Sequence, residues 1–491
     1  MSEKRKLKSV KFNFIMNLVR VLMTIIFPLI TYPYASRILS SAGVGRASYV
    51  ATIVSYFQLI ASFGVNNYAI TEGAKIRDDK RKLDKFVSEV FLINIIFTVI
   101  SYSLFIVVFL IPKFDGYQNL LLISSASILL TTLGMEWLFE LLEEYEYITI
   151  RSVIFQFVAL MLLFVFVKDN DDVVWYVFLT VLSTTGYGLV TVFQSRKYVC
   201  FFRQKICWND LKAHLKPMFY MFGVSIASVI YLNSDITMLG WMKGDSDAGI
   251  YTIASKTNQI ICTLIKSLST VILPRLSYYI ENGKKDEYGA LLQNAFRFMM
   301  MLIAPCMIGM LLISPEVIRL IGGDDFLSGA TASRILAINL FFSPINGFVA
   351  YQIFMPKKKQ KIIFWATFGG AIFNLLINLL LIPKWSFNGA AIATVLAEAL
   401  VMVISIIMGH KMIPFKGMFH GVWKYWIATV PMIIFYFVLQ NIEFSNYIIY
   451  MLVMILIGVA TYGGMLLLLK DKLLIEECKS IKARIFRVKK D

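Results

Sequence analysis

Charged side chains are scarce in this sequence. Asp, Glu, Lys and Arg make up 16% of its 491 residues, whereas 58% are hydrophobic and the mean hydropathy is +0.70. A soluble domain usually carries about 25% charged residues. A soluble core could not bury this much apolar surface without leaving large exposed patches, whereas lipid solvates such surface directly. The composition therefore excludes an ordinary soluble protein and indicates a membrane protein.

Motifs of enzyme chemistry are absent as well. The sequence contains no GxxxxGK[ST] phosphate loop, no GxSxG and no HExxH. Its three histidines, His214, His410 and His420, show no metal-ligand spacing, and its five cysteines include no CxxC pair. We therefore expect no catalytic residue, no metal, no cofactor and no disulfide, and we expect that the protein is not an enzyme.

Acidic residues are outnumbered by basic ones. The sequence has 48 Lys and Arg against 31 Asp and Glu, which gives a formal net charge of +17. In a soluble protein this excess would suggest nucleic acid as a partner. Here the basic residues lie in short tracts between apolar runs, as they do in cytoplasmic loops of membrane proteins. We therefore expect membrane lipid, and not nucleic acid, as a partner.

Apolar runs of about 20 residues, the length that spans the hydrocarbon core as a helix, recur along the whole chain. They predict an all-α polytopic membrane protein with about fourteen transmembrane helices. The first run is too long for a removable signal peptide, so we expect it to be retained. The expected spans are residues 12–32, 44–64, 86–110, 118–140, 149–168, 172–194, 216–241, 250–273, 290–314, 329–354, 361–382, 386–409, 421–440 and 444–468.

The basic tracts fall in every second predicted loop. Tracts such as 80–82 and 357–359 fall in loops of one parity, together with both basic ends of the chain. Loops of the other parity are mainly acidic, as at residues 169–172 and 324–325. Because positive loops stay inside, the alternation predicts that both termini are cytoplasmic. One loop on that side, residues 143–147, is acidic, but acidic residues contribute little to orientation.

A short echo suggests two halves. Residues 42–47 (AGVGRA) open the second predicted span, and residues 248–254 (AGIYTIA) open the eighth. Parallel repeats of this kind occur in transporters. We expect an N-terminal lobe of six spans over 1–200 and a C-terminal lobe of six spans over 201–415. Two extra spans and a basic cytoplasmic tail would then occupy 416–491.

Polar residues form a stripe along the first predicted span. They follow one another at steps of four, three, four and seven, which places them within about 60° of one helix face. The stripe contains Asn13, Asn17, Arg20, Thr24 and Thr31.

A second stripe follows the eighth predicted span, within about 80° of one face. It contains Thr252, Lys256, Gln259, Thr263, Lys266 and Thr270. A charge at mid-span costs about 2.5–3.5 kcal/mol. We therefore expect both stripes to face a wet cavity or polar partners. As alternatives, Lys256 and Lys266 could each extend toward a membrane surface, and Arg20 could be a structural hydrogen-bonding arginine.

Further polar residues lie in other predicted spans. Tyr231 shares a face of the seventh span with Asp235, and Asn374 and Asn378 lie four residues apart in the eleventh. The asparagines would line the cavity or hydrogen bond between helices. Asp235 and Glu398 are acidic residues inside the membrane, so they are candidates for ion coupling or for an ion pair with a cavity cation.

Several segments, in order along nearly the whole chain, resemble one known family. They are residues 28–34 (PLITYPY), 36–39 (SRIL), 43–45 (GVG), 55–57 (SYF), 136–139 (EWLF), Glu143, Tyr145, 147–149 (YIT), Arg151, 249–251 (GIY), 273–275 (LPR), 356–359 (PKKK) with Lys361, Asn374, Asn378, 382–383 (IP) and 389–391 (GAA) with Glu398. Together they resemble bacterial polysaccharide-repeat-unit flippases of the Wzx type, within the multidrug/oligosaccharidyl-lipid/polysaccharide exporter superfamily. One departure is Ser40-Ser41, where the family often has Leu-Gly followed by a small residue.

The resemblance implies a bundle of fourteen helices with a central cationic cavity in the bacterial cytoplasmic membrane. It implies that an oligosaccharide unit on undecaprenyl pyrophosphate is flipped to the outer leaflet by alternating access, beside a polymerase and glycosyltransferases of the same pathway. Arg20, Lys256 and Lys266 would then bind pyrophosphate or acidic sugars. The Asn, Gln, Thr and Tyr side chains of the stripes would bond sugar hydroxyls.

Three other functions are weighed against this one. A cation-coupled multidrug exporter of the same superfamily would favour carboxylates facing its cationic cargo, whereas the charged residues of the stripes here are cations. A membrane polysaccharide polymerase would need a large outside loop, and the predicted outside loops are short. A lipid II flippase for peptidoglycan is a related alternative, which the order of the motifs disfavours.

Overall fold

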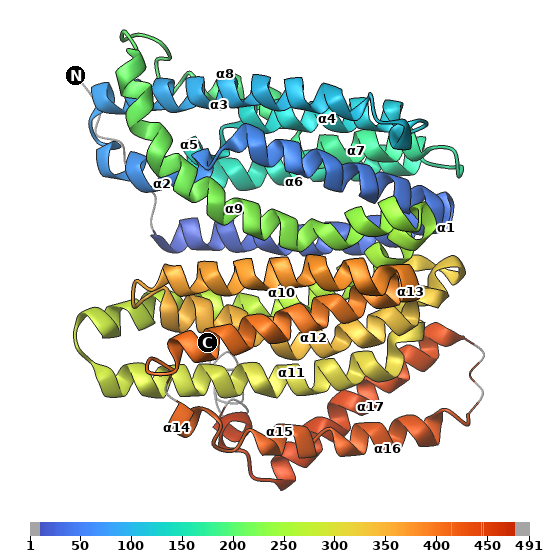
Figure 1. The fold of residues 1–491 in the computed structure, drawn as a ribbon. Coiled ribbons are helices and arrows are strands. Elements are labelled where there is room, and N and C mark those ends of the chain that lie inside the picture. Colours follow the sequence, from blue (N-terminus) through green and yellow to red (C-terminus); the bar gives the residue numbers. More distant parts are fainter. Residues whose placement is uncertain (1–9, 414, 443, 445, 477–491) are drawn as a thin grey trace, which may run out of the picture. The chain divides into compact units, whose positions relative to one another are not determined.

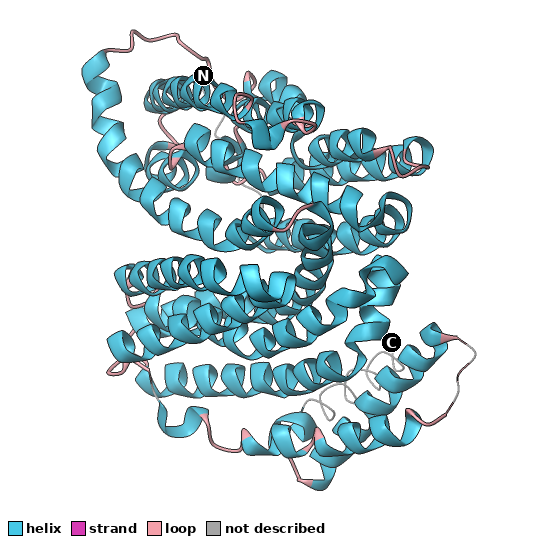
Figure 2. Ribbon diagram, turned by 45° about the vertical axis from the view of Figure 1, so that its right-hand side comes forward, coloured by secondary structure: helices cyan, strands magenta, loops and turns pink. Residues whose placement is uncertain are grey.

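The computed structural model describes residues 10–413, 415–442, 444 and 446–476, and within them every regular element is a helix (Figure 1, Figure 2). The prediction of an all-α fold is thereby confirmed. The basic residues at the start and end of the chain, with Cys478, lie outside the described residues. The predicted cytoplasmic location of both termini therefore stays a prediction.

Contacts divide the chain into two units, residues 1–252 and 253–491. Unit 1 contains α1 (Val10–Ser62), α2 (Val65–Ile76), α3 (Lys80–Val108), the 3-10 helix Pro112–Phe114, α4 (Gln118–Gly134), α5 (Glu136–Leu141), α6 (Tyr145–Phe166), α7 (Val173–Thr185), α8 (Gly188–Ser195), α9 (Trp208–Met242) and the start of α10 (Asp245–Glu281).

Unit 2 begins inside α10. It continues with α11 (Lys285–Gly322), the 3-10 helix Asp324–Gly329, α12 (Ala330–Phe348), a π-helical turn (Val349–Phe354), α13 (Gln360–Gly409), α14 (Phe415–Met418), α15 (Trp423–Ile427), α16 (Val430–Leu439) and α17 (Tyr447–Leu468).

Helix α9 packs along the second half of α1. Asn233 Nδ2 donates to Ser55 Oγ at 3.2 Å, and the hydroxyls of Thr237 and Tyr56 are hydrogen-bonded at 3.0 Å. These contacts hold α9 in unit 1, although its span was assigned to the predicted C-terminal lobe. The predicted division rests on the repeat of six spans, whereas the two units are defined by contacts between residues. The division into 1–200, 201–415 and 416–491 therefore stays a prediction.

Ten of the described helices are long and apolar enough to cross a membrane. Three of these ten contain a non-helical residue: Ser40 in α1, Ile313 in α11 and Ser386 in α13. Helices α1 and α13, of 53 and 50 residues, are long enough to supply two spans each. Helix α10 has 37 residues but a polar stripe, and the apolar segment Trp423–Leu439 is shorter. With these two, the structure provides the fourteen predicted spans.

The kinks at Ser40 and Ser386 replace loops that the spans predicted. Ser40 has φ 57° and ψ 178°, and Ser386 has φ 46° and ψ −128°, while the flanking residues remain helical. A non-glycine residue at positive φ is uncommon. Its conformation turns the chain within one residue, so each pair of spans forms one kinked helix.

Each unit has its own apolar core. In unit 1, Trp137 and Phe139 of α5 are among the buried side chains that pack with residues of α2, α3 and α9. In unit 2, Phe296 of α11 stacks edge-on against Phe348 of α12, at 5.6 Å between ring centroids. The short helix α5 is thus anchored by its apolar face, which fixes the direction of its polar residues.

Candidate functional site

The predicted stripe of the first span lies on the first half of α1, within unit 1. Its residues do not share one environment: Asn13 is buried, Asn17 and Arg20 are half-buried, and Thr24 is exposed. The side-chain oxygens of Asn13 and Asn17 accept no hydrogen bond from the described part of the chain. Thr24 donates to the carbonyl of Val21, in its own helix.

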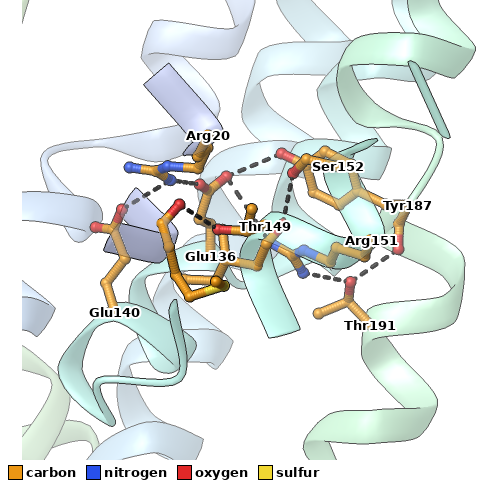
Figure 3. A network of polar contacts seen from close by, with 10 residues as sticks. Arg20, Glu136, Glu140, Thr149, Arg151, Ser152, Tyr187 and Thr191 are labelled. Atoms are coloured by element: carbon orange, nitrogen blue, oxygen red, sulfur yellow. Dashed lines mark hydrogen bonds and ion pairs between the residues drawn. The ribbon is translucent and has the colours of Figure 1, made fainter. Parts of the chain in front are cut away.

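Arg20 is held by two carboxylates of α5 (Figure 3). Its Nη1 lies 2.5 Å from Oε1 of Glu136 and 3.3 Å from Oε1 of Glu140. The two glutamates are four residues apart, so they project from the same face of a helical turn. Because both carboxylates lie close to the same guanidinium nitrogen, Arg20 and the two glutamates form a group of three charges inside a predicted membrane region.

A second arginine completes this cluster from α6 (Figure 3). Arg151 Nη2 lies 3.9 Å from Glu136, and its Nη1 donates to Thr191 Oγ1 at 2.6 Å. Its guanidinium carbon stands 4.2 Å from the ring centroid of Tyr187, a cation–π contact, while the Tyr187 hydroxyl donates to Glu136 at 2.9 Å. Two arginines and two glutamates thus balance one another. We call this set the charge cluster: Arg20, Glu136, Glu140 and Arg151.

The charge cluster changes the interpretation of Arg20. The side chain of Arg20 is 25% exposed, and its guanidinium is already hydrogen-bonded to both carboxylates. A phosphate that bound there would have to displace them. These contacts correspond to the structural alternative for Arg20, and its binding of pyrophosphate stays a prediction.

The acidic loop after α5 also contains a carboxylate that is paired with an arginine. Glu143 pairs with Arg77, which follows α2, at 2.5 Å. This hydrogen bond raises the pKa of the Arg77 guanidinium. One carboxylate of this loop is therefore neutralised by an arginine from elsewhere in unit 1. The feature of the sequence that could have indicated the charge cluster is the spacing of Glu136 and Glu140, which lie four residues apart at the end of a predicted span.

A polar cleft adjoins the α1 stripe inside unit 1. One part of the cleft, of about 370 Å³, lies between α1, α4 and α7, and a second part, of about 210 Å³, lies between α1, α6 and α7. Both parts are lined by Tyr32, Tyr176, Thr180 and Thr184. Thr24 lines the second part. The stripe of α1 therefore faces this cleft one turn beyond Arg20.

The stripe on α10 has a different electrostatic setting. Lys256 Nζ donates to Gln259 Oε1 at 3.2 Å, and Lys266 Nζ donates to Ser343 Oγ of α12 at 2.8 Å. Thr263 donates to the carbonyl of Gln259. Both lysines are half-buried, and in the described chain neither forms an ion pair with a carboxylate. The α10 stripe thus carries two cations with neutral partners.

Thr252, Asp235 and Tyr231 lie in unit 1. Thr252 is buried and donates to the carbonyl of Ala248, so it does not share the exposed face of Lys256 and Gln259. Asp235 is buried and accepts from the Tyr251 hydroxyl at 2.5 Å. Tyr231 is half-buried on the same helix, α9.

In unit 2, the predicted carboxylate Glu398 joins α13 to α12, and the predicted amides Asn374 and Asn378 lie together in α13. Asn346 donates to Oε2 of Glu398 at 2.5 Å and to its carbonyl at 2.9 Å. Asn378 donates to Asn374 Oδ1 at 3.0 Å, and both asparagines are buried. The Asn346–Glu398 contact joins two helices, whereas the bond between Asn378 and Asn374 lies within α13. Hydrogen bonding of the two asparagines between helices and their place in a cavity both stay predictions.

Sequence reasoning missed one buried polar relay. His214 of α9 is hydrogen-bonded through Nδ1 to the Tyr68 hydroxyl at 2.7 Å and through Nε2 to Glu89 at 2.9 Å. Glu89 is buried in α3, beside Lys85 at 3.5 Å. The relay ties α2, α3 and α9 together. Its partners are far apart in the sequence, so no local pattern indicated it.

The described residues contain no group of three or more His, Cys, Asp or Glu residues that could hold a metal ion. The polar chemistry they offer is of two kinds: cations on α10 and neutral hydroxyls and amides in the cleft of unit 1. Both kinds suit the binding of a polar cargo through charge and hydrogen bonds.

The fold is similar to that of a solved flippase. Superposed on a structure titled "Lipid II flippase MurJ, inward closed conformation", the chain has a TM-score of 0.75 at 18% identity, covering 94% of this chain and 100% of that one. At this identity the likeness establishes the fold. The structure and its polar helix faces thus define a multi-pass helical membrane protein with the architecture of that flippase.

Sequence comparison specifies the family. Residues 10–280 match the family described as "Polysaccharide biosynthesis protein", and residues 221–380 match the family described as MatE. The first match covers more than half of the chain, so this chain belongs to the polysaccharide biosynthesis protein family.

Two relatives show what the chain is similar to. A protein of Shigella dysenteriae named "Putative O-antigen transporter" is 23% identical over 386 residues, which are 78% of this chain and 95% of the relative. A Haloferax volcanii protein named "Probable low-salt glycan biosynthesis flippase Agl15" is 22% identical over 236 residues, 48% of each chain. The resemblance to polysaccharide flippases that the motifs indicated is thereby confirmed.

Proposed function

We propose that this protein is a flippase for oligosaccharide units linked to undecaprenyl pyrophosphate. It moves them from the inner to the outer leaflet of the bacterial cytoplasmic membrane by alternating access, for the assembly of a surface polysaccharide. A polymerase and glycosyltransferases of the same pathway are its expected partners, and both termini are cytoplasmic. Family membership and the names of the two relatives support the glycan as cargo.

One observation supports an anionic carrier. Lys256 and Lys266 lie on one face of a membrane helix with neutral hydrogen-bonding partners. An intramembrane cation without a counter-charge is costly, and such residues mark the pathways of substrates. A pyrophosphate group would supply that counter-charge through charge-assisted hydrogen bonds. The α10 stripe is therefore the part of the molecule to which we assign the pyrophosphate, in a cationic cavity.

The carboxylates are assigned differently. Asp235 and Glu398 each accept a hydrogen bond from a neutral side chain, from Tyr251 and Asn346 respectively. They remain our candidates for ion coupling. Glu136 and Glu140 are balanced by arginines, so a structural role is proposed for them.

The proposal is tested with purified protein in liposomes. A fluorescent oligosaccharide on undecaprenyl pyrophosphate is placed in one leaflet, and its arrival in the other is measured by quenching. Wild-type protein is expected to move it, and the double variant Lys256→Met, Lys266→Met is expected to lose at least about tenfold in rate, because each charge-assisted hydrogen bond contributes about 1.5–3 kcal/mol. Absence of movement by the wild type contradicts the proposal.

A second candidate function rests on the match of residues 221–380 to the MatE family. A cation-coupled multidrug exporter would protect cells from cationic drugs. Expression in a drug-sensitive bacterial strain is expected to leave drug sensitivity unchanged, because the α10 stripe would repel a cation. Drug resistance that Lys266→Met leaves intact would favour the exporter over the flippase.

A further inference from the structure

The cleft inside unit 1 is large enough for a small-molecule ligand. Its larger part, of about 370 Å³, falls within the range of ordinary ligand pockets, about 300–1,000 Å³. The smaller part shares four lining residues with it, so the two parts adjoin. The cleft lies between helices of one bundle, a usual location for ligand sites.

The cleft is lined by polar but uncharged side chains together with apolar ones. Neither part is lined by Lys, Arg, Asp, Glu or His, although the charge cluster begins one turn away at Arg20. An ion that entered the cleft would lose its hydration without gaining a counter-charge, which is costly. The cleft therefore selects against a phosphate, an acidic sugar and a cationic drug.

The cleft offers hydrogen-bond acceptors to a ligand. Thr180 and Thr184 use their hydroxyl hydrogens on carbonyls of their own helix, so their oxygens are left as acceptors. The side-chain oxygen of Gln156 is buried and accepts no hydrogen bond from the described part of the chain. A buried acceptor without a donor costs free energy until a ligand or a water supplies one.

Amides, aromatic rings and aliphatic side chains also line the cleft. Gln58 lines the larger part and Gln156 the smaller, and an amide can donate and accept at once. Tyr32 and Tyr176 line both parts, and each offers an apolar ring face with a hydroxyl at its edge. A ligand that fits must carry several hydroxyl groups around an apolar, uncharged frame.

We infer that this cleft of unit 1 is a binding site for an uncharged sugar residue of the cargo. Sugar hydroxyls donate to Gln156 and to the threonine oxygens, and they accept from the amides of the two glutamines. The sugar ring packs on a tyrosine face. The inference rests on the proposed function, which it deepens by naming the part of the cargo and the residues that bind it.

The test uses cysteine protection in the full-length protein. Thr184→Cys is introduced into a chain whose exposed Cys200 and Cys207, together with Cys478, are replaced by serine, and labelling by a maleimide is timed. Undecaprenyl pyrophosphate that bears a neutral oligosaccharide is expected to slow labelling about tenfold, and bare undecaprenyl pyrophosphate is expected not to slow it. Equal protection by both lipids would overturn the inference.

Native mass spectrometry of the wild type separates this inference from the proposed function. If the glycosylated lipid binds but the thiol of the Thr184→Cys variant is not protected, the site is elsewhere and only the inference fails. If the wild type binds neither lipid, the proposed function fails and the inference fails with it.

Matched variants test the same site without a label. Gln156→Leu and Thr184→Val remove polar atoms from the cleft at nearly constant size, so folding is expected to be kept. Each is expected to weaken binding of the glycosylated lipid about three- to tenfold, while binding of the bare lipid is unchanged. Thr461→Val is the control, because that hydroxyl bonds carbonyls of its own helix α17 in unit 2. An equal effect of the control variant would overturn the assignment.

Discussion

Gly45 of α1 and Gly249 of α10 pack backbone against backbone. A Cβ atom at Gly45 would stand 1.7 Å from the carbonyl oxygen of Asp245 and 3.0 Å from the nitrogen of Gly249. Beside them the hydroxyls of Ser41 and Ser246 are hydrogen-bonded at 2.7 Å. The two segments that echo each other in the sequence therefore contact each other in unit 1.

We expect Gly45→Ala to destabilise the protein. The added methyl group would overlap backbone atoms, which cannot rotate away as a flexible side chain would. Overpacking of this kind costs about 1–3 kcal/mol, and close helix contacts in membranes depend on small residues. The measurement is the thermal unfolding midpoint of the purified protein in detergent.

Gly463→Ala in α17 is the control for this change, because no atom lies within 4 Å of its Cβ position. Its midpoint should equal or exceed that of the wild type, since alanine favours a helix by about 1 kcal/mol. Equal midpoints for Gly45→Ala and the wild type would contradict the close packing.

Arg20→Met is expected to lower stability. It leaves Glu136 and Glu140 without the nearer of their cations, and a charge left unpaired in a low-dielectric site is strongly destabilising. Because the three side chains are 23–35% exposed, we expect about 1–3 kcal/mol, less than for a fully buried pair. Thermal unfolding and the amount of protein in the membrane report the change.

The double variant Arg20→Met, Glu140→Gln separates pairing from substrate binding, because Glu136 keeps Arg151 as its partner. If Arg20 serves only to balance the glutamates, neutralising Glu140 together with Arg20 restores stability and export of polysaccharide. If Arg20 binds pyrophosphate, stability returns but export does not. Either result assigns Arg20 to one of its two roles.

Lys266→Met is expected to reduce export without a loss of stability. Its partner Ser343 is neutral, so removal of the ammonium leaves no unpaired charge in unit 2. Surface polysaccharide of complemented cells and the unfolding midpoint are measured together. Lys113→Met, at an exposed position between α3 and α4, is the control and should change neither. Normal export by Lys266→Met would remove this lysine from the cargo path.

Asp79 caps the N-terminus of α3 and makes stability depend on acid. Its carboxylate accepts from the backbone nitrogens of Arg81 and Lys82, each at 3.1 Å, and these bonds hold the pKa of Asp79 below its ordinary 3.8. Because the pKa of Asp79 is lower in the folded protein than the value of 3.8 in the unfolded chain, its ionised carboxylate stabilises the fold above pH 3.8. This stabilisation is lost as the pH falls through the pKa of the folded protein. Asp79→Ala should therefore have a lower unfolding midpoint at pH 7, and the difference should vanish in strong acid.

Asp79→Asn is the matched control for this pH dependence. An asparagine oxygen can cap the helix but does not titrate in this range. Its midpoint should lie close to that of the wild type at pH 7. A difference between Asp79→Ala and the wild type that is the same at pH 7 and pH 3 would contradict the role of the carboxylate.

The sequence predicted the spans well because apolar length is a local property. The run 444–468 became α17, Tyr447–Leu468, and the run 86–110 fell within α3 and the residues just after it. The turns at Ser40 and Ser386 were expected as loops, because nothing in the sequence marks a serine that will adopt positive φ. Packing of neighbouring segments decides such a conformation.

The polar site was predictable in part. The stripe on α10 follows from helical periodicity, and the structure leaves Lys256, Gln259 and Thr263 on an accessible face. Thr252 shares that periodicity but is buried, because the first turns of α10 pack on α1. The partners of Arg20 could not be read from its stripe, because they lie on another helix that only tertiary packing brings near.

The charge cluster also bears on how the protein is inserted into the membrane during its synthesis. Arg20 is synthesised 116 residues before Glu136, the carboxylate that neutralises it. Until α5 emerges from the ribosome, the first helix holds an arginine that resists transfer into lipid by about 2.5–3.5 kcal/mol. The insertion machinery must therefore shelter α1, or leave it shallow, until the carboxylates of α5 have arrived.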